Sequence, residues 1–480
     1  RPTAGPDLGE AELTAGVIRR EQLSLTKIGA GSWTLTANNS GNILNQLQIN
    51  GGSVVLSGAS AKVGFITTIL GEGGALTLDN STSTLSNRMG GAMSIQSTTN
   101  DRLLSLRGGI LNFLGGSSAV TETMATLTAL EGSSRLTLTA GTAATTLSFD
   151  TFSVSSGTNR GSVTIDAGSG QLGGGAAASG RVNVIATTAT LVGNVRPDVI
   201  GMDSSGIGFV TNDANGLRLL TAADTALGYF SPATYLGTVT PSVIAAAAST
   251  VANAATTANV NLTGAVGLYG ATTSNSLNLS SGGQLTAYGN AAVASQYGAG
   301  GSFNTLTLTS GAILAESGNL GLAGGAITAG AALLQYHVVG DLTTTAYSLG
   351  TTSVLKDGAG MLTLNQRSLN TAPYFQNEGT TKLGVANALI AVPTASIATV
   401  YDLVVNGGTF DLNGNGIYDD DNTDYTIERR SFQVATPNHL DSDDDGDGIP
   451  TKDEITINAD GTISFPDTDK DGIPDYLDKD

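Results

Sequence analysis

A short unit of strand, glycine turn and strand recurs along this chain and limits what the chain can fold into. Residues 25–58 read LTKIGAGSWTLTANNSGNILNQLQINGGSVVLSG, in which apolar residues alternate with Thr or Ser beside glycine turns. Alternation with period two predicts strands, and glycine supplies the dihedral angles of tight turns. The unit returns as KDGAGMLTL at 356–364, NEGTTKL at 377–383 and NGGTFDL at 406–412. Such a unit buries its apolar face only against its neighbours, which predicts a stack of coils.

Composition favours one elongated repeat over several compact domains. The 480 residues exceed the roughly 250–300 residues of a single core, and 65 of them are glycine. Only 13% are charged, against about 25% in ordinary globular domains. The chain has no cysteine, which excludes disulfides, thiolate metal sites and cysteine nucleophiles. No apolar stretch reaches the roughly 18 residues of a membrane span, so we expect no membrane insertion.

The net charge of -19 is concentrated in the last part of the chain. Residues 401–480 contain 21 acidic and 5 basic residues, a net charge of -16. An acidic segment of this kind repels nucleic acid and attracts cations. We therefore expect no nucleic-acid partner and a cation ligand at this end.

The recurrence of predicted strands divides the chain into four parts. Residues 1–165 and 261–422 carry the repeated strands and are expected to form the two parts of one body. Residues 166–260 interrupt the rhythm as an irregular insertion or seam, and residues 423–480 form the acidic segment. The phrases at 277–285 and 306–314 superpose at a spacing of 29 residues, which predicts successive coils. Over residues 11–25, short strands and an amphipathic helix remain alternatives.

Several of these phrases resemble a known bacterial repeat. LTKIGAGSWTLTANNSG with INGGSVVLSG, and VLKDGAGMLTLNQ with NEGTTKLGVANAL and VVNGGTFDLNGNG, resemble the autotransporter-associated β-strand repeat of bacterial surface and secreted proteins. The resemblance implies an all-β fold, a right-handed parallel β-helix (β-solenoid), and export to the cell surface or the extracellular space. It says almost nothing about activity.

Two acidic loops near the end have the ligand spacing of calcium sites. Carboxylates occupy positions 1, 3 and 5 of each loop, a glycine occupies position 6, and an isoleucine carbonyl occupies position 7. The loops resemble thrombospondin type 3 repeats, and prolines after each isoleucine disfavour the helices of an EF-hand. The predicted Ca²⁺ ligands are Asp443, Asp445, Asp447, Ile449 and Glu454 in one loop, and Asp467, Asp469, Asp471, Ile473, Asp475 and Asp478 in the other.

Weaker ligand candidates flank these loops. Asp411, Asn413, Asn415 and Asp419 have a related spacing, although the same residues could simply close a coil. Asp441 and Asp480 could each serve a neighbouring ion. Between the two loops, residues 454–457 and 462–465 are expected to pair as a hairpin around an Asp-Gly turn.

These patterns predict an extracellular structural protein that binds copies of itself. A filament, tube, sheath or surface layer would fit, with calcium stabilising the assembly. The alternatives are an adhesin or passenger-type binding protein, with cell-surface or matrix polysaccharide as a ligand, and a polysaccharide-active β-helix enzyme. We expect no enzyme activity and no catalytic or organic-cofactor residues, because the chain lacks a nucleophile elbow, a phosphate loop and a zinc motif. Its two histidines, His337 and His439, are far apart in sequence, and His337 is expected to be structural.

Overall fold

The computed structural model describes most of the repeated part of the chain. The described residues are 24–89, 102–154, 160–174, 180–233, 235–237, 251–252, 255–269, 271–287, 305–322, 325–329, 332–350, 353–365, 369–370, 372–384 and 403–411, with 456–457, 463–464, 466 and 468. Within them the chain is all-β, and its long parallel sheets are consistent with a parallel β-helix. The one helical turn among these residues is the 3₁₀ turn η1, Thr225–Leu227.

The strands form two bodies, which we call the first stack (residues 24–219) and the second stack (residues 229–411). In the first stack the chain passes alternately between two ladders of parallel strands, and the long strand β9 contributes to both. One ladder contains β1 (Ser24–Lys27), β3 (Asn38–Ile49), β5 (Lys62–Gly71), β7 (Leu103–Arg107), β9 (Val120–Thr139), β10 (Thr145–Val154), β13 (Arg181–Ala189) and β12 (Gln171–Leu172). The other contains β2 (Ser32–Leu35), β4 (Gly52–Ser57), β6 (Gly74–Asp79), β8 (Ile110–Leu114), β9, β11 (Gly161–Asp166) and β14 (Val199–Asp203).

The first stack ends in an antiparallel meander. Strand β14 pairs antiparallel with β15 (Gly206–Asp213), which pairs antiparallel with β16 (Gly216–Leu219). The turn η1 then leads the chain into the second stack.

The second stack has three sheets, and each complete coil visits them in turn. The first sheet, which we call the seam sheet, contains β17 (Tyr229–Phe230), β20 (Asn259–Leu262), β23 (Ser276–Leu279), β26 (Ala312–Ala315), β29 (Leu334–Val338), β32 (Val354–Asp357), β35 (Tyr374–Gln376) and β37 (Leu403–Val405). The second contains β19 (Val251–Ala252), β18 (Tyr235–Gly237), β21 (Ala265–Tyr269), β24 (Gly283–Ala287), β27 (Gly318–Gly321), β30 (Leu342–Thr344), β33 (Met361–Leu364), β36 (Thr380–Leu383) and β38 (Thr409–Asp411). The third contains β22 (Thr272–Ser274), β25 (Thr305–Leu308), β28 (Ala326–Thr328), β31 (Tyr347–Gly350) and β34 (Leu369–Asn370).

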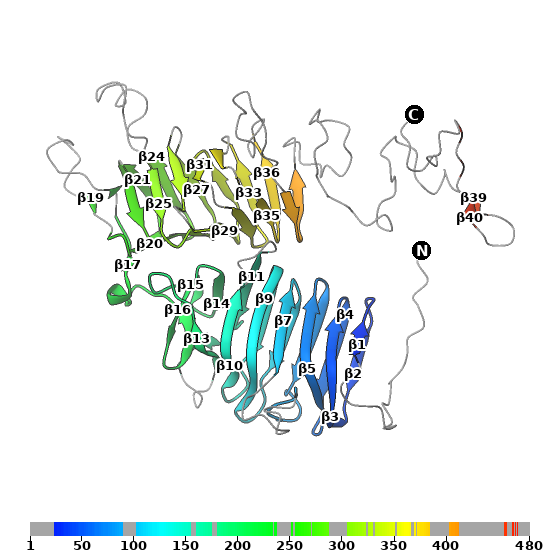
Figure 1. Cartoon of the computed structure of the whole chain (residues 1–480). Coiled ribbons are helices and arrows are strands. Elements are labelled where there is room, and N and C mark those ends of the chain that lie inside the picture. The colour runs from blue at the N-terminus through cyan, green and yellow to red at the C-terminus, as the bar shows by residue number, and fades with distance from the viewer. Residues whose placement is uncertain are drawn as a thin grey trace, which may run out of the picture.

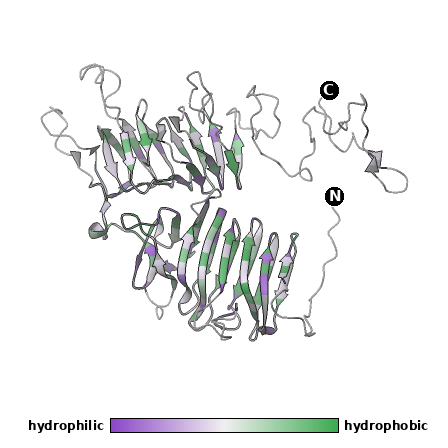
Figure 2. Cartoon of the chain, in the orientation of Figure 1, coloured by the Kyte–Doolittle hydropathy of each residue, from purple (hydrophilic) through white to green (hydrophobic). Residues whose placement is uncertain are grey.

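The strand pairs of the opening unit confirm the alternation of the sequence. Trp33 pairs with Val54 and Leu35 with Leu56 across the parallel β2–β4 ladder. Inward residues therefore stack on inward residues of the next coil, which buries them without long side chains or a thick layer. Figure 2 shows the resulting alternation of hydrophobic and hydrophilic residues along the strands.

The expected spacing of 29 residues between two later phrases is wrong. Leu277 lies on β23 of the seam sheet and pairs with Ile313, whereas Leu306 lies on β25 of the third sheet and pairs with Thr272 and Ile327. Both phrases carry leucines two positions apart before a glycine turn, so their local sequence patterns are alike although they occupy different faces of the coil.

The two stacks do not form one continuous rod. Each has its own apolar core, one including Leu47, Leu127 and Val184 and the other including Leu277, Tyr336 and Leu362. Figure 1 shows that the chain reverses after β16, so that the second stack lies beside the first and runs back along it. The seam sheet lies between the two cores, and every residue of its strands β26, β29, β32 and β35 is buried.

Candidate functional site

Of the predicted calcium ligands, Asp411 alone lies within the described residues. Asp411 is the last residue of β38, is buried, and has its Oδ2 atom 3.9 Å from Nζ of Lys382 on the neighbouring strand. The other predicted ligands lie outside the described residues: Asn413, Asn415, Asp419, Asp441, Asp443, Asp445, Asp447, Ile449, Glu454, Asp467, Asp469, Asp471, Ile473, Asp475, Asp478 and Asp480. His439 and residues 11–23 also lie outside them.

The expected hairpin between the two predicted calcium loops is present. Strands β39 (Thr456–Ile457) and β40 (Ile463–Ser464) pair antiparallel, with Ile457 opposite Ile463. Elsewhere, the part of the chain that the structure describes holds no group of three or more His, Cys, Asp or Glu residues arranged to bind a metal ion.

Two lysines hold equivalent glycine turns, a role that the sequence reading missed. In Lys27-Ile28-Gly29-Ala30-Gly31, the Lys27 ammonium donates hydrogen bonds to the carbonyls of Ile28 (2.8 Å), Gly29 (2.6 Å) and, in the next coil, Gly51 (3.2 Å). The ammonium thus joins two successive coils at their turn. The available signal was the identical spacing of Lys before Gly-Ala-Gly in both copies of the unit.

The second copy of this turn has a similar arrangement, with a lysine again bound to carbonyls of its own turn and of the next coil. Lys356 Nζ donates to the carbonyls of Gly358, Gly360 (2.6 Å) and Glu378 (2.7 Å). Burial lowers the pKa of Lys356 to about 8. In the next coil, Gly379 has φ +69°, and a Cβ atom there would lie 2.3 Å from the Gly358 carbonyl oxygen, so only glycine fits.

The seam between the stacks has an apolar centre. Val195, Ile200 and Phe209 of the first stack form a buried cluster with Ala312 and Leu314 of the seam sheet. Since Ala312 and Leu314 project away from the core of their own stack, the cluster is an interface between the two bodies.

A buried His–Asp pair lies on the face of the seam sheet that contacts the first stack. His337 Nδ1 is 3.1 Å from Oδ2 of Asp357 on the adjacent strand, and His337 Nε2 is 2.7 Å from the carbonyl oxygen of Pro197 in the first stack. Burial opposes the ionisation of Asp357, but the hydrogen bond and charge of His337 lower the pKa of Asp357 below its usual value. Asp357 and the Pro197 carbonyl, the two neighbours of the imidazole, are both hydrogen-bond acceptors.

Further along the seam, the two stacks are joined at the turns between strands. Asn377 Nδ2 donates to the Arg160 carbonyl at 2.8 Å, and Ser133 Oγ donates to Glu378 Oε2 at 2.7 Å. The guanidinium of Arg160 lies 6.0 Å from the ring centroid of Phe375. These contacts connect residues more than 200 positions apart, and they fix the alignment of one stack against the other.

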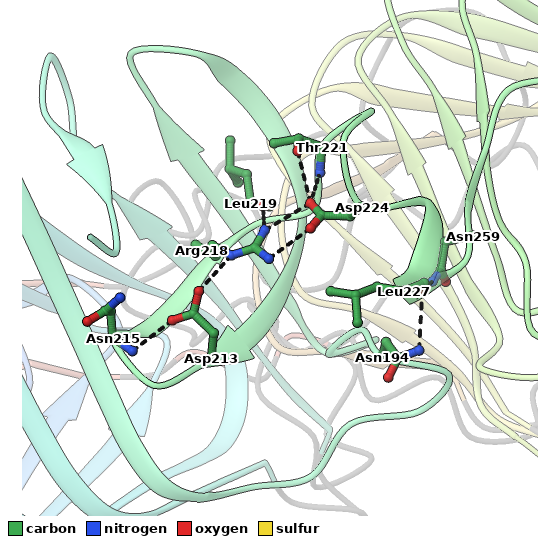
Figure 3. Close-up of polar contacts among 9 residues, drawn as sticks. All are labelled: Asn194, Asp213, Asn215, Arg218, Leu219, Thr221, Asp224, Leu227 and Asn259. Carbon is green, nitrogen blue, oxygen red and sulfur yellow. Dashed lines mark hydrogen bonds and ion pairs between the residues drawn. The ribbon is translucent and has the colours of Figure 1, made fainter. Parts of the chain in front are cut away.

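At the reversal of the chain, an arginine ties the meander to η1 (Figure 3). Arg218 Nη2 lies 2.8 Å from Asp224 Oδ1, and Arg218 Nε lies 2.8 Å from Asp213 Oδ2. Asp224 also accepts hydrogen bonds from the backbone N–H and the hydroxyl of Thr221. Hydrogen bonds from Arg218 lower the pKa of Asp224 to about 2, against the opposing effect of burial.

Asparagines fix the other side of this junction. Asn194 of the first stack and Asn259 of the seam sheet both donate to the Leu227 carbonyl (Figure 3). A cavity of about 20 Å³ beside Phe209, Asn259 and Asn278 has room for about one water molecule. The buried Oδ1 atom of Asn278, which lines this cavity, has no hydrogen-bond partner among the described residues.

A second buried charge network lies inside the first stack. Glu122 on β9 accepts hydrogen bonds from the backbone N–H groups of Arg88 (2.7 Å) and Met89 (3.0 Å). The side chain of Arg88 donates to Asn80 Oδ1 (2.9 Å) and to the carbonyls of Gly58 (2.9 Å) and Ala61 (3.3 Å), which binds an irregular segment to the coils. Burial raises the pKa of Glu122 to about 7.

The outermost coils leave apolar residues only partly covered. Leu25, Trp33 and Leu35 of β1 and β2 pack against the first core but are partly exposed. Val405 and Phe410 of β37 and β38 are partly buried against the second core. Within the described residues, each of these four strands pairs on one side only.

Comparison of the chain with protein-family models, with curated proteins and with solved structures finds no match. Among the described residues, no helix is long and apolar enough to cross a membrane.

Proposed function

We propose that the protein is an extracellular structural protein whose copies assemble, with Ca²⁺ ordering its acidic C-terminal segment. The observation that carries this proposal is the open end of the doubled stack. There, β1, β2, β37 and β38 have unpaired edges among the described residues, next to partly exposed apolar side chains. Unpaired edges of parallel ladders are templates for further strands, so they favour association.

For the finer fold we propose a right-handed parallel β-helix of the autotransporter-associated type. The parallel ladders support this assignment, as does the coil of 20 residues that separates Tyr336 from its partner Lys356. The shared lysine turns at residues 27–31 and 356–360 support a common repeat ancestry. Such a fold implies export from a bacterial cell and an extracellular or cell-surface location.

The calcium proposal is supported by ligand spacing and by position in the chain. Carboxylates at loop positions 1, 3 and 5 with glycine at 6 provide the oxygen ligands that Ca²⁺ prefers. Residue 412 follows β38 directly, so the segment that holds the loops starts at the open end of the doubled stack. Calcium bound to the loops would reduce the repulsion among their carboxylates.

Electron microscopy of the purified full chain, with Ca²⁺ and after chelation, tests the assembly. We expect ordered assemblies with Ca²⁺ and their loss after chelation. Particles of one chain under both conditions would contradict the proposed function.

Calorimetric titration with Ca²⁺ tests the ligands separately. Asp443→Asn removes the predicted ligand at position 1 of the loop and should lower the number of bound ions or weaken their binding at least tenfold. Asp444→Asn removes the same kind of charge from position 2 of the loop, which is not a ligand position, and should change affinity much less. Equal effects of the two substitutions would indicate a diffuse acidic segment without a specific site.

A further inference from the structure

Both free ends of the doubled stack face the same way. Among the described residues, the ladders of the first stack begin at β1 and β2, and two sheets of the second stack end at β37 and β38. Because the chain reverses, Figure 1 shows β1 and β2 at the same end of the molecule as the last strands of the second stack. One end of the molecule therefore presents both the start and the finish of a parallel coil.

The two ends also have matching side chains. Ser32 on β2 forms a hydroxyl pair with Ser53 of the next coil (2.7 Å), and Thr409 on β38 forms one with Thr380 of the preceding coil (2.8 Å). Each of these hydroxyl ladders ends at an edge strand, at Ser32 in one stack and Thr409 in the other. The inward neighbours of these residues, Trp33 and Phe410, are both partly exposed aromatic residues.

In the second stack, another parallel coil precedes the coil with the Lys-x-Gly-Ala-Gly turn. There, Lys356 pairs with Tyr336 of the preceding coil, and Leu362 pairs with Leu342. The equivalent residues Lys27 and Trp33 pair only with the following coil among the described residues.

The open end is stepped. A Cβ atom at Gly407, in the last described coil, would lie 3.2 Å from Glu72 Oε1, in the turn between β5 and β6. The first stack therefore extends beyond the second by the two coils that contain β1 to β4. Ile28 lies in the outermost turn of this extension and is 72% exposed, whereas its equivalent in the second stack, Asp357, is buried against the first stack.

We propose that two copies of the chain dock by these stepped ends in a closed two-fold dimer. In it, β37 and β38 of each copy continue the ladders of β1 and β2 of the other copy, with Thr409 beside Ser32 and Phe410 over Trp33. The two-fold axis is perpendicular to the long axes of the two stacks and to the line that joins the stacks. This axis places the first stack of each copy, which is the longer at this end, against the second stack of its partner. Strand direction is preserved at both junctions.

The step makes this surface self-complementary. The two-coil extension of each copy fills the space beyond the second stack of the other, which covers Ile28 in both. Because both contacts form at once, the arrangement closes at two copies rather than growing head to tail. This inference rests on the proposed function, since it names the surface through which copies first associate.

Cysteine cross-linking in the full chain tests the register. The chain has no native cysteine, and neighbouring strands lie about 4.8 Å apart, which a disulfide can span. Oxidation of a Ser32→Cys, Thr409→Cys double variant should give covalent dimers and nothing larger. An equal mixture of the two single variants should also give linked dimers, while neither single variant alone should. A ladder of trimers and longer species would overturn closure, and monomers alone would show that another segment, such as residues 1–23, covers the edge.

Sedimentation velocity gives an independent test. Ile28→Asp places a charge on the covered step and should convert dimers to monomers with unchanged circular dichroism. Leu103→Asp is the matched control, since Leu103 is 39% exposed on β7 but lies away from the open end, and it should leave the dimer intact. Equal dimerisation of both variants would overturn the proposed surface. Cross-linked dimers without larger calcium-dependent assemblies would refute the proposed function only, and larger assemblies without cross-links would refute the dimer only.

Discussion

The Nε2 atom of His337 lies 2.7 Å from the carbonyl oxygen of Pro197, a residue 140 positions earlier in the chain. This contact joins the seam sheet to the segment that precedes β14 in the first stack, and Asp357 lies beside the other nitrogen of the imidazole. The buried imidazole of His337 thus connects a coil of the second stack, which the sequence pattern indicates only as a local repeat, to a distant part of the chain. The consequences can be measured.

Replacing both members of the His337–Asp357 pair should cost much less than the sum of the two single replacements. His337→Ala leaves the Asp357 carboxylate buried without its partner, for which we expect a loss of about 3 kcal/mol in the free energy of unfolding. Asp357→Ala should cost a similar amount, and the double variant much less than the sum of the two. Urea denaturation of the three variants gives the coupling energy, and strictly additive losses would contradict a paired interaction.

The lysine at a glycine turn should matter more than a lysine on a strand surface. Lys356→Met removes the donor for three carbonyls, and we expect a loss of about 2 kcal/mol in unfolding free energy. Lys62 occupies a partly exposed position at the start of β5. Lys62→Met therefore serves as the control and should cost less than about 1 kcal/mol. Chemical denaturation compares the two variants, and equal losses would show that the carbonyl contacts add little.

Glu122 should make stability fall as pH rises towards neutrality. Its folded pKa of about 7 lies above its usual value of 4.5, so the folded state retains a proton that the unfolded state releases. This contribution is fully present below pH 4.5 and is lost as the pH rises through 7. Glu122→Gln should flatten the decline, as measured by urea unfolding at several pH values between 4 and 8. An unchanged slope would show that Glu122 titrates normally in the fold.

The junction should have the opposite dependence at acidic pH. The folded pKa of Asp224 is about 2 against a usual 3.8, so its contribution is present above pH 3.8 and is lost as the pH falls through 2. Arg218→Met removes the hydrogen bonds that lower this pKa and should reduce the acid sensitivity between pH 4 and 2. Arg135→Met breaks the more exposed pair with Asp166 and should leave that sensitivity unchanged. Urea unfolding across this range distinguishes the two variants.

Much of the fold is predictable because it is local. The alternation in Trp33–Leu35 and Val54–Leu56 specifies strands, and the glycines between them specify turns. The pairing of β2 with β4 therefore follows from residues that are close together in the sequence. The hairpin at β39 and β40 was also predictable, since an Asp-Gly turn separates two short strands. The calcium ligands remain a prediction from spacing, because all of them except Asp411 lie outside the described residues.

The seam could not be predicted in the same way. His337, Asp357 and Asn377 sit at outward positions of their strands or turns, where a sequence pattern alone indicates solvent. Their burial depends on the reversal of the chain, which brings a second body against the seam sheet. The buried Lys27 and Lys356 were missed for a related reason, since lysine is rarely fully buried and its carbonyl partners come partly from the next coil.

The sequence by itself determined the building unit, its parallel stacking and the acidic segment with its calcium-type spacing. Each of these depends on residues close together in the chain, where period, turn chemistry and ligand spacing act directly. Tertiary structure alone decided that the stack folds back on itself, that one sheet is buried on both faces, and that both free ends point the same way. Those features depend on which surfaces meet after the coils have formed, and a repeat presents similar surfaces at many positions, so local patterns do not distinguish them.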